Sequence, residues 1–281
     1  MFTIRKKQLL SPSVYRYEVD APRVAEKTQP GQFVILRTHE EGERIPLTVA
    51  DFDREKGVLT LIFQVVGAST ELLAQMKEGD AILDLVGPLG QKSHIASGLG
   101  TVVCIGGGIG VAPVYPITRG MKEAGNRVIS IIGAKSQDIL IMEKEMRAAS
   151  DETLVTTDDG SYGIKGFVTT ALKELLTRGE RIDLVYAIGP VVMMKSVADV
   201  TRPLGIKTIV SLNPVMVDGT GMCGGCRVQV GGETKFACVD GPEFDGAIVD
   251  FAGLQARQGM YREMEARARE HVCRIGLGGN A

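Results

Sequence analysis

Asp218-Gly-Thr-Gly-Met-Cys223-Gly-Gly-Cys226, with Cys238 shortly after it, is the stretch around which the chain is organised. Three of the chain's five cysteines fall in this window, and four of the quoted positions are glycine. Glycine lets the backbone adopt φ values that a Cβ would forbid, so the chain can curl tightly around a bound group. The stretch therefore predicts a ligand-binding loop whose principal donors are thiolates.

The spacing of the candidate ligands narrows the kind of site. Plant-type [2Fe–2S] sites use Cys-x4-Cys-x2-Cys plus a distant Cys, so this pattern fits if an aspartate takes the first position. A structural zinc site is the alternative, because zinc also accepts thiolates and carboxylates. A disulfide framework is disfavoured, since nothing else in the chain is typical of a secreted protein. The predicted metal ligands are Asp218, Cys223, Cys226 and Cys238.

Length and composition limit the class of protein. The 281 residues suggest two domains and a smaller third region, and 44% hydrophobic with 23% charged residues is ordinary for a globular chain. A net charge of −2 and the absence of Trp give neither the charge nor the stacking surface that nucleic acid needs. The chain shows no apolar signal region and no run long enough to span a membrane. We therefore expect a cytoplasmic protein without a nucleic-acid or membrane partner.

Residues 1–97 are predicted to form an antiparallel β-barrel. Short β-rich runs separated by turns dominate this segment, and several strands at such spacing with little helix are typical of a small barrel or sandwich. One helix is expected from Ser69 to Met76, with Ser69 or Thr70 as its N-cap. The expected strands are Phe2–Ile4, Val14–Val19, Phe33–Arg37, Pro46–Val49 and Val58–Val66.

Two motifs in this segment suit a phosphate-bearing cofactor. Arg44-Ile-Pro-Leu-Thr48 places a guanidinium and a hydroxyl four residues apart, so in an extended chain both lie on one face. There they can hold a phosphate and the edge of a flavin ring. Gly67-Ala-Ser69-Thr70 opens the expected helix, whose free N–H groups form an anion site. Each motif alone also fits a surface arginine or an ordinary helix cap, but their occurrence in one β-domain favours a cofactor site.

Residues 98–212 change to alternating strands and helices. Thr101–Ile105 is a continuous apolar strand, Gly106–Gly110 follows it, and a helix is expected over 111–124. This alternation predicts a parallel sheet with right-handed crossovers and helices on both faces. Further elements are expected over 128–132, 139–149, 154–157, 167–177, 184–188, 191–200 and 208–211.

In such sheets ligands bind outside the carboxyl ends of the strands. Three turns are expected there, at Gly106–Gly110, at Thr157–Gly160 and at Gly189-Pro190. The glycine run departs from G-x-G-x-x-G, because Pro113 stands where the third glycine would be. Three such turns at successive strand ends favour a nucleotide site. Lys135-Ser136 either meets a ribose 2′-phosphate or is simply solvated, so the sequence leaves NAD and NADP open.

Residues 213–281 form the third predicted region, which contains the cluster loop. A hairpin is expected from Arg227–Val230 and Thr234–Ala237, returning the chain to Cys238. A charged C-terminal helix is expected over 251–269, with Met260, Met264 and Ala268 on one face. Cys273 is expected not to be a ligand.

The order of these parts resembles the ferredoxin-NADP reductase superfamily over nearly the whole chain. The motifs that carry the resemblance are Arg-x-Pro-x-Thr, Gly-Gly-Gly-Ile-Gly and the terminal cysteine loop. Within the superfamily the chain resembles dihydroorotate dehydrogenase electron-transfer subunits. It is most similar to the small (alpha) subunits of NADH-dependent reduced ferredoxin:NADP oxidoreductases, also called sulfide dehydrogenase beta subunits. That small-subunit family leads us to expect an aspartate at the position of Asp218, where the dihydroorotate branch has a fourth cysteine.

The resemblance implies FAD, a [2Fe–2S] cluster and NAD(H), with NADP(H) possible, and it assigns residues to each. Thr48 would lie near the isoalloxazine, as the catalytic position. Many superfamily members carry Cys-Gly-Pro facing the nicotinamide, whereas this chain has Ile188-Gly189-Pro190, so orientation must come from packing. The implied FAD residues are Arg44, Pro46, Leu47, Thr48, Phe63, Gln64, Val65, Gly67, Ser69 and Thr70, and the nucleotide residues are Gly107, Gly108, Gly110, Asp158 and Gly189.

The implied activity is that of an FAD and iron–sulfur oxidoreductase subunit that passes electrons between NAD(H), FAD and the cluster. The resemblance adds a heterodimer with a larger subunit that carries a second FAD and [4Fe–4S] clusters. Bifurcation in that subunit would reach ferredoxin. One alternative is the electron-transfer subunit of a dihydroorotate dehydrogenase. An alternative from another class is a zinc-bearing, nucleotide-binding regulator without redox turnover.

Overall fold

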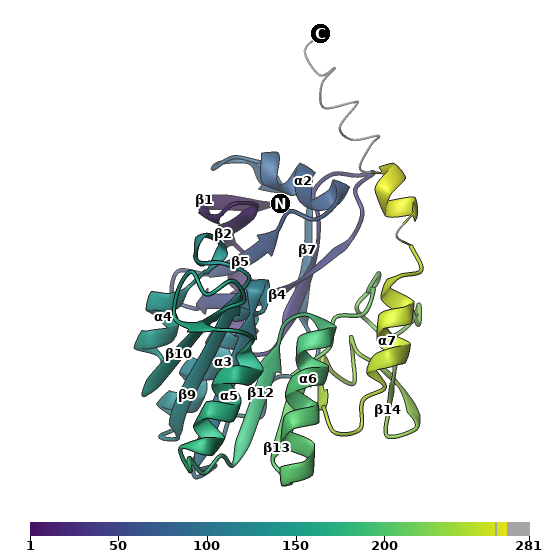
Figure 1. Cartoon of the computed structure of the whole chain (residues 1–281). Helices are drawn as coiled ribbons and strands as arrows, with labels where there is room; N and C mark the ends of the chain where they lie inside the picture. Colours follow the sequence, from purple (N-terminus) through teal and green to yellow (C-terminus); the bar gives the residue numbers. More distant parts are fainter. Residues whose placement is uncertain (262, 269–281) are drawn as a thin grey trace.

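A computed structural model of the chain describes residues 1–261 and 263–268. Figure 1 shows three parts: a barrel that includes β1, β2 and β5, a parallel sheet that includes β9, β10 and β12, and a region with β14 and α7 beside that sheet. This arrangement confirms the predicted fold class. No helix in the described part of the chain is long and apolar enough to cross a membrane.

The barrel is a seven-stranded antiparallel sheet in the order β6-β1-β2-β5-β4-β3-β7. Its two edge strands, β6 and β7, are separated in the chain by Leu83 alone. Because the edges are sequence neighbours, the sheet has to curl back on itself, and the result is a nearly closed barrel. The strands are β1 (Phe2–Ser11), β2 (Val14–Asp20), β3 (Phe33–Arg37), β4 (Ile45–Asp53), β5 (Val58–Gln64), β6 (Ala81–Ile82) and β7 (Asp84–Leu89).

Two helices belong to the barrel segment. α1 (Pro22–Lys27) was not expected from the sequence, and its Pro at the first position fits a helix start. α2 (Ala68–Gln75) is the expected helix, but its N-cap is Gly67 rather than Ser69 or Thr70. The reason is that the Thr70 hydroxyl reaches back from the first turn to accept from the Gly67 amide at 3.1 Å.

The second sheet has the order β11-β10-β9-β8-β12-β13-β16, and all its pairs are parallel except β13 with β16. Alternate side chains of β8 go to opposite faces: Val102 and Cys104 pack with α3, whereas Val103 and Ile105 pack with α5 and α6. Helices therefore cover both faces, as predicted. The elements are β8 (Thr101–Gly107), α3 (Val111–Glu123), β9 (Arg127–Ala134), α4 (Glu143–Ala148), β10 (Glu152–Thr157), β11 (Ile164–Lys165), α5 (Val168–Thr177), β12 (Leu184–Ile188), α6 (Val191–Thr201) and β13 (Lys207–Ser211), with 3-10 turns η1 (Gly108–Gly110), η2 (Gln137–Ile139) and η3 (Arg202–Leu204).

Two predicted helices differ from the structure. The helix expected over 139–149 is only α4, because η2 ends at Ile139 and Met142 adopts φ +57° just before the helix begins. The helix expected over 251–269 is interrupted: α7 (Phe251–Gln258) ends at Gly259, and helical residues resume at 263–268. Met260 lies in the intervening turn, while residue 269 and Cys273 fall outside the described residues.

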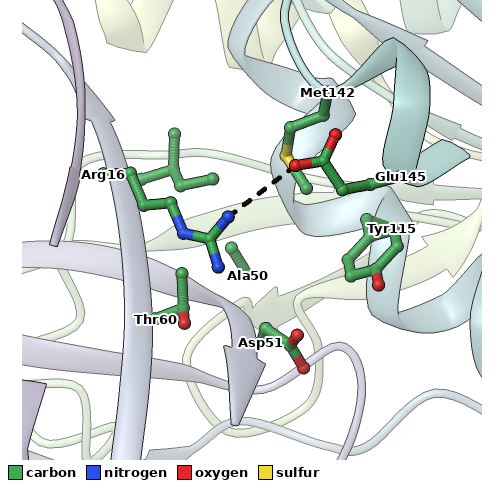
Figure 2. Close-up of a pocket in the computed structure, with 8 residues that line it drawn as sticks. Arg16, Ala50, Asp51, Thr60, Tyr115, Met142 and Glu145 are labelled. Carbon is green, nitrogen blue, oxygen red and sulfur yellow. Dashed lines mark ion pairs between the residues drawn. The ribbon is translucent and has the colours of Figure 1, made fainter. Parts of the chain in front are cut away.

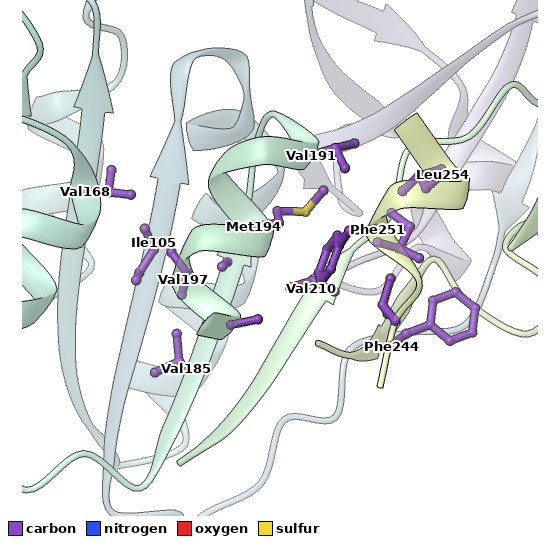
Figure 3. Close-up of a cluster of buried hydrophobic side chains, with 14 of the residues drawn as sticks. Ile105, Val168, Val185, Val191, Met194, Val197, Val210, Phe244, Phe251 and Leu254 are labelled. Carbon is purple, nitrogen blue, oxygen red and sulfur yellow. The ribbon is translucent and has the colours of Figure 1, made fainter. Parts of the chain in front are cut away.

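The C-terminal region is built into the parallel sheet. β14 (Arg227–Val230) and β15 (Glu233–Phe236) form the predicted hairpin, but β16 (Glu243–Asp245) leaves it and pairs with β13. Figure 3 shows part of the shared core, which contains Val197 of α6, Val210 of β13, and Phe251 and Leu254 of α7. The domain boundaries predicted at residues 97/98 and 212/213 stay predictions. β16 comes after the second boundary in the chain, yet it pairs with β13, which comes before it.

Candidate redox site

The cluster loop has the glycine conformations that its sequence calls for. Gly219, Gly221 and Gly224 have φ values of +74°, +85° and +66°, which a side chain rarely allows. The Asp218 carboxylate accepts from the amides of Thr220 at 2.9 Å and Cys223 at 2.7 Å. These bonds, that from Thr220 first, lower the pKa of Asp218. The carboxylate is thus ionised and already faces the loop that holds the first cysteine.

The three cysteines of the loop are free thiols, and Cys223 and Cys226 accept backbone N–H bonds. The Gly225 amide donates to Cys223 Sγ and the Cys238 amide donates to Cys226 Sγ, both at 3.4 Å. Cys226 and Cys238 are buried, whereas Cys223 is exposed. Burial, with the neighbouring Cys226 thiol, raises the pKa of Cys238 to about 12. Loading with iron would therefore have to displace that proton, as metal binding to thiolates does.

These residues fit an iron–sulfur cluster in the chemistry of their donors. Three thiols and one ionised carboxylate come from the glycine-rich loop and the hairpin that follows it, and N–H···S bonds of the kind that tune such clusters are present. Among residues 1–261 and 263–268, no three His, Cys, Asp or Glu side chains are arranged to hold one metal ion. The structure therefore does not gather three of the four predicted ligands around one point.

The predicted flavin residues lie on two neighbouring parts of the barrel. Arg44 precedes β4 and is exposed, while Pro46, Leu47 and Thr48 are half-buried on β4 itself. Gln64 ends β5 and is exposed, and Val65 is half-buried. The Phe63 side chain is 2% exposed and stacks against Tyr15 inside the barrel. Phe63 can therefore reach a flavin only through its backbone.

The start of α2 lies beside the loop that carries Arg44. Ser69 Oγ donates to the carboxylate of Glu43, which links this loop to the first turn of the helix. The Thr70 hydroxyl is used within the helix start, accepting from Val66 and Gly67 and donating to the Gly67 carbonyl. The helix nevertheless keeps the amides of its first turn for an anion. This part of the barrel therefore fits a pyrophosphate. The Glu43 carboxylate, which Ser69 binds at the helix start, shows that an anionic group can lie there.

The predicted nucleotide residues gather at one edge of the parallel sheet. Gly107 ends β8, Gly110 precedes α3, Asp158 follows β10 and Gly189 follows β12. Packing requires Gly110, because a Cβ there would lie 2.1 Å from the Ile188 carbonyl oxygen, whereas a Cβ on Gly107 would meet the flexible Met193 side chain, 2.2 Å from its Sδ. Gly108 has φ +56° and an open surrounding. The two turns therefore approach each other closely at the strand ends, where a nucleotide binds in sheets of this kind, with Gly108 and Gly189 half-buried.

The structure adds Asp138 to this edge, a residue that the sequence reasoning missed. Asp138 lies in η2 just beyond β9, and the Ser136 hydroxyl donates to its carboxylate at 2.5 Å. Lys135 is exposed beside it. A carboxylate after the second strand suits a ribose 2′-hydroxyl and repels a 2′-phosphate. The sequence signal for this residue is an acidic side chain four residues after the buried strand, in Lys135-Ser-Gln-Asp138.

One barrel strand, β3, lies between the cluster loop and β4, the strand that carries the predicted flavin residues Pro46, Leu47 and Thr48. On β3, Ile35 lies directly opposite Pro46 of β4. A Cβ on Gly219 would lie 2.7 Å from Ile35 Cδ1 and 2.7 Å from Leu89 Cδ1, so the cluster loop packs on β3 and β7. Neighbouring strands are roughly 4.8 Å apart. The predicted flavin site on β4 and the predicted cluster site in the loop are therefore about one strand apart.

Two hollows lie away from these residues, between the barrel and the helices of the parallel-sheet domain. One is a groove of about 890 Å³ between the barrel and α3, and the other is a cavity of about 50 Å³ that Arg16, Tyr115 and Glu145 help to line (Figure 2). Neither is lined by a predicted site residue.

Comparisons with protein families match two parts of the chain. Residues 104–199 match the oxidoreductase NAD-binding domain. Residues 213–250 match the iron–sulfur cluster binding domain of dihydroorotate dehydrogenase B. The second match contains all four predicted metal ligands, and the first contains the glycine turn, Asp158 and Gly189.

Individual relatives match nearly the whole chain. A Thermotoga maritima protein, a homologue of the electron-transfer subunit of dihydroorotate dehydrogenase B (NAD(+)), is 50% identical over 93% of this chain and 92% of its own length. The Enterococcus faecalis electron-transfer subunit of that enzyme is 35% identical over 89% of this chain and 97% of its own. A chain of the NADH-dependent reduced ferredoxin-NADP oxidoreductase, solved to study flavin-based electron bifurcation, superposes with a TM-score of 0.92. It is 48% identical and covers 96% of this chain and 97% of its own.

Proposed function

Because the chain belongs to the family of dihydroorotate dehydrogenase B electron-transfer subunits and their homologues, we propose that it carries electrons from NADH through FAD and a [2Fe–2S] cluster to a larger subunit. It is an oxidoreductase subunit with a ferredoxin-NADP reductase-like fold. When bound, FAD would accept a hydride from NADH and release the two electrons singly to the cluster. The chain itself supplies the binding surfaces and the spacing between them.

The observation that carries this proposal is the position of β3. Ile35 lies opposite Pro46 of the flavin strand and also contacts the loop at Gly219. A flavin on β4 and a cluster in the loop would thus lie close together, on either side of β3. We assign Arg44, Thr48 and the start of α2 to FAD, and the edge at Gly107–Gly110 with Asp158 and Gly189 to the nucleotide. Asp138 favours NADH over NADPH at that edge.

Asp218 and the three cysteines are assigned to the cluster. Cys223 is exposed, so one side of the site reaches the surface. Met222, next to it, is 88% exposed, and Val217 is exposed as well. The guanidinium of Arg257 donates to the Gly225 carbonyl at 3.0 Å, which connects α7 to the loop. An apolar, methionine-bearing surface around a cluster suits docking of an electron-accepting partner.

The partner that we propose is the larger flavin and [4Fe–4S] subunit of a bifurcating enzyme. The 48% identity to the chain of the bifurcating enzyme, against 35% to the Enterococcus subunit, supports this choice. The electron-transfer subunit of a dihydroorotate dehydrogenase is the second candidate, because its cluster-domain family matches residues 213–250. Capture of a barrel-type dihydroorotate dehydrogenase as the partner would favour that candidate. The proposal also places the chain in a reducing, cytoplasmic compartment.

The test is an anaerobic analysis of the purified protein for iron, sulfide, zinc and flavin. Visible and EPR spectra are then recorded during separate additions of NADH and NADPH. We expect FAD, two irons per chain and bleaching by NADH at concentrations well below those of NADPH. Asp218→Cys is expected to change the EPR spectrum and the potential of the cluster, and unchanged spectra would remove Asp218 from the ligands. Zinc without flavin would overturn the whole proposal.

A further inference from the structure

Two ion pairs connect the barrel to the helices of the nucleotide-binding domain on either side of a cavity. Arg119 of α3 lies 2.8 Å from Asp51 of β4, and Arg16 of β2 lies 3.7 Å from Glu145 of α4. Figure 2 shows Arg16, Asp51, Tyr115 and Glu145 around the cavity of about 50 Å³. That volume has room for a few water molecules, and Arg16 Nε is buried without a partner among the described residues. Beside the two ion pairs, Val14, Ala50 and Ile62 of the barrel pack with residues of α3 in one apolar cluster. Asp51 with Arg119 is the closer of the two ion pairs.

Local structure holds both members of this contact in place. The pairing of β4 with β5 shifts between Val49 and Asp51, so the strand bulges there, and a bulge re-aims the side chain that follows it. Asp51 Oδ1 also accepts from the Phe52 amide at 2.8 Å. The Arg119 guanidinium lies 5.9 Å from the Phe52 ring and 5.4 Å from the Tyr115 ring. With the carboxylate and two rings around it, the guanidinium has little freedom to turn away.

The contact connects the two elements that matter for hydride transfer. α3 begins directly after the glycine turn, and Arg119 lies eight residues beyond Val111, about 12 Å along the helix axis. On β4, Asp51 is three residues beyond Thr48, about 10 Å along the strand. The strand that carries the predicted flavin residues and the helix that follows the glycine turn are therefore paired with each other at Asp51 and Arg119.

We propose that Asp51 and Arg119 are positioning residues. They hold the glycine turn before α3 at the correct distance from β4, the strand that carries the predicted flavin residues. This inference rests on the proposed function. Hydride transfer needs reacting atoms about 3–3.5 Å apart, and an error of about 1 Å can cost about 100-fold in rate. A loosened joint would therefore slow the transfer step while leaving each binding surface intact.

The test is flavin reduction by NADH in an anaerobic stopped-flow instrument, over a range of NADH concentrations. In Asp51→Asn and Arg119→Met we expect the limiting rate to fall by about tenfold or more. The half-saturating NADH concentration, the flavin content and the EPR spectrum should stay close to those of the native protein. In Arg119→Lys, which keeps the positive charge, the limiting rate should fall less than in Arg119→Met. Asp53→Asn is the matched control, because it removes the pair of Asp53 with Lys56 within the barrel and should leave the limiting rate unchanged.

The outcomes are distinct. An unchanged limiting rate in flavin-loaded Asp51→Asn, which is nearly isosteric and carries the test if Arg119→Met does not fold, overturns the inference. A rate that falls only together with flavin content and thermal stability also overturns it, since the pair would then be merely structural. If the native protein itself is not reduced by NADH or NADPH, the proposed function fails first.

Discussion

At the scale of single residues, the carboxyl group of Glu243 lies where the interdomain linker, the barrel and β16 meet. It accepts from Ser93 Oγ at 2.5 Å, and a Cβ on Gly31 would lie 2.7 Å from its Oε1. The Ser93 amide in turn donates to the Pro30 carbonyl of the barrel at 2.8 Å. Burial raises the pKa of Glu243 from its ordinary 4.5 to about 7, although the Ser93 bond acts against this. The group therefore binds its proton more tightly in the folded chain than in the unfolded one.

The sign of the pH dependence follows from that difference. Between pH 4.5 and 7 the folded state holds the extra proton, so the free energy of unfolding falls as pH rises through this window and stays lower above it. We predict that Glu243→Gln, which keeps a partner for Ser93, is more stable than the native protein at pH 8, by at most roughly 3 kcal/mol. At pH 5 this advantage should disappear. Urea-unfolding midpoints at the two pH values measure it, with exposed Glu233→Gln as control, and parallel pH profiles would contradict the prediction.

At the scale of elements, α2 depends on the barrel for its position. An isolated helix of eight residues is not stable in water, and here its last carbonyls are bound from β1 and β2. Lys7 Nζ donates to the carbonyls of Ala74 at 2.6 Å and Met76 at 2.8 Å, and the Tyr17 hydroxyl donates to that of Leu73 at 2.6 Å. A cation at this end also complements the helix dipole. Because these bonds fix the C-terminal end of α2, they also fix its N-terminal end, which lies at the proposed pyrophosphate site.

Lys7→Met should consequently weaken FAD binding without altering the cluster. Hydrogen bonds from a charged group are worth about 1.5–3 kcal/mol, so we predict roughly a tenfold to hundredfold rise in the dissociation constant for FAD. Titration of the flavin-free protein with FAD, followed by flavin fluorescence, measures this change. Lys6→Met, an exposed neighbour on β1, is the control. Equal affinities for the two variants would show that Lys7 does not act through α2.

The elements also show what sequence alone can predict. Phe33–Arg37, Leu184–Ile188 and Arg227–Val230 were predicted to the residue, because each is a β-rich run ended by turn residues. β16 was missed, because three residues become a strand only through pairing with distant β13. The same holds for the candidate site. Glycine turns at strand ends are visible in the sequence, whereas the contact of Ile35 with Gly219 and the pair of Asp51 with Arg119 exist only after folding.

At the scale of the whole molecule, one buried core joins the cluster region to both other parts. It contains Phe33 and Ile35 of the barrel, Val197 of α6, and Cys226 and Cys238 of the loop, with many other side chains. Figure 3 shows its part between α6, β13 and α7. Because β16 also extends the parallel sheet, we infer that order in the cluster loop is transmitted to the nucleotide-binding edge.

Loss of the cluster should therefore destabilise the chain as one unit. We predict that Cys223→Ser, which removes a proposed ligand from an exposed position, lowers the single thermal unfolding midpoint by roughly 5–10 °C, or about 2–3 kcal/mol. Cys238→Ser should lower it further, because that side chain also belongs to the core. Anaerobic calorimetry with NADH titration of each variant measures both effects. If the Cys223→Ser protein kept its midpoint, or lost only a separate small transition, the cluster region would be an autonomous unit and β16 merely a contact.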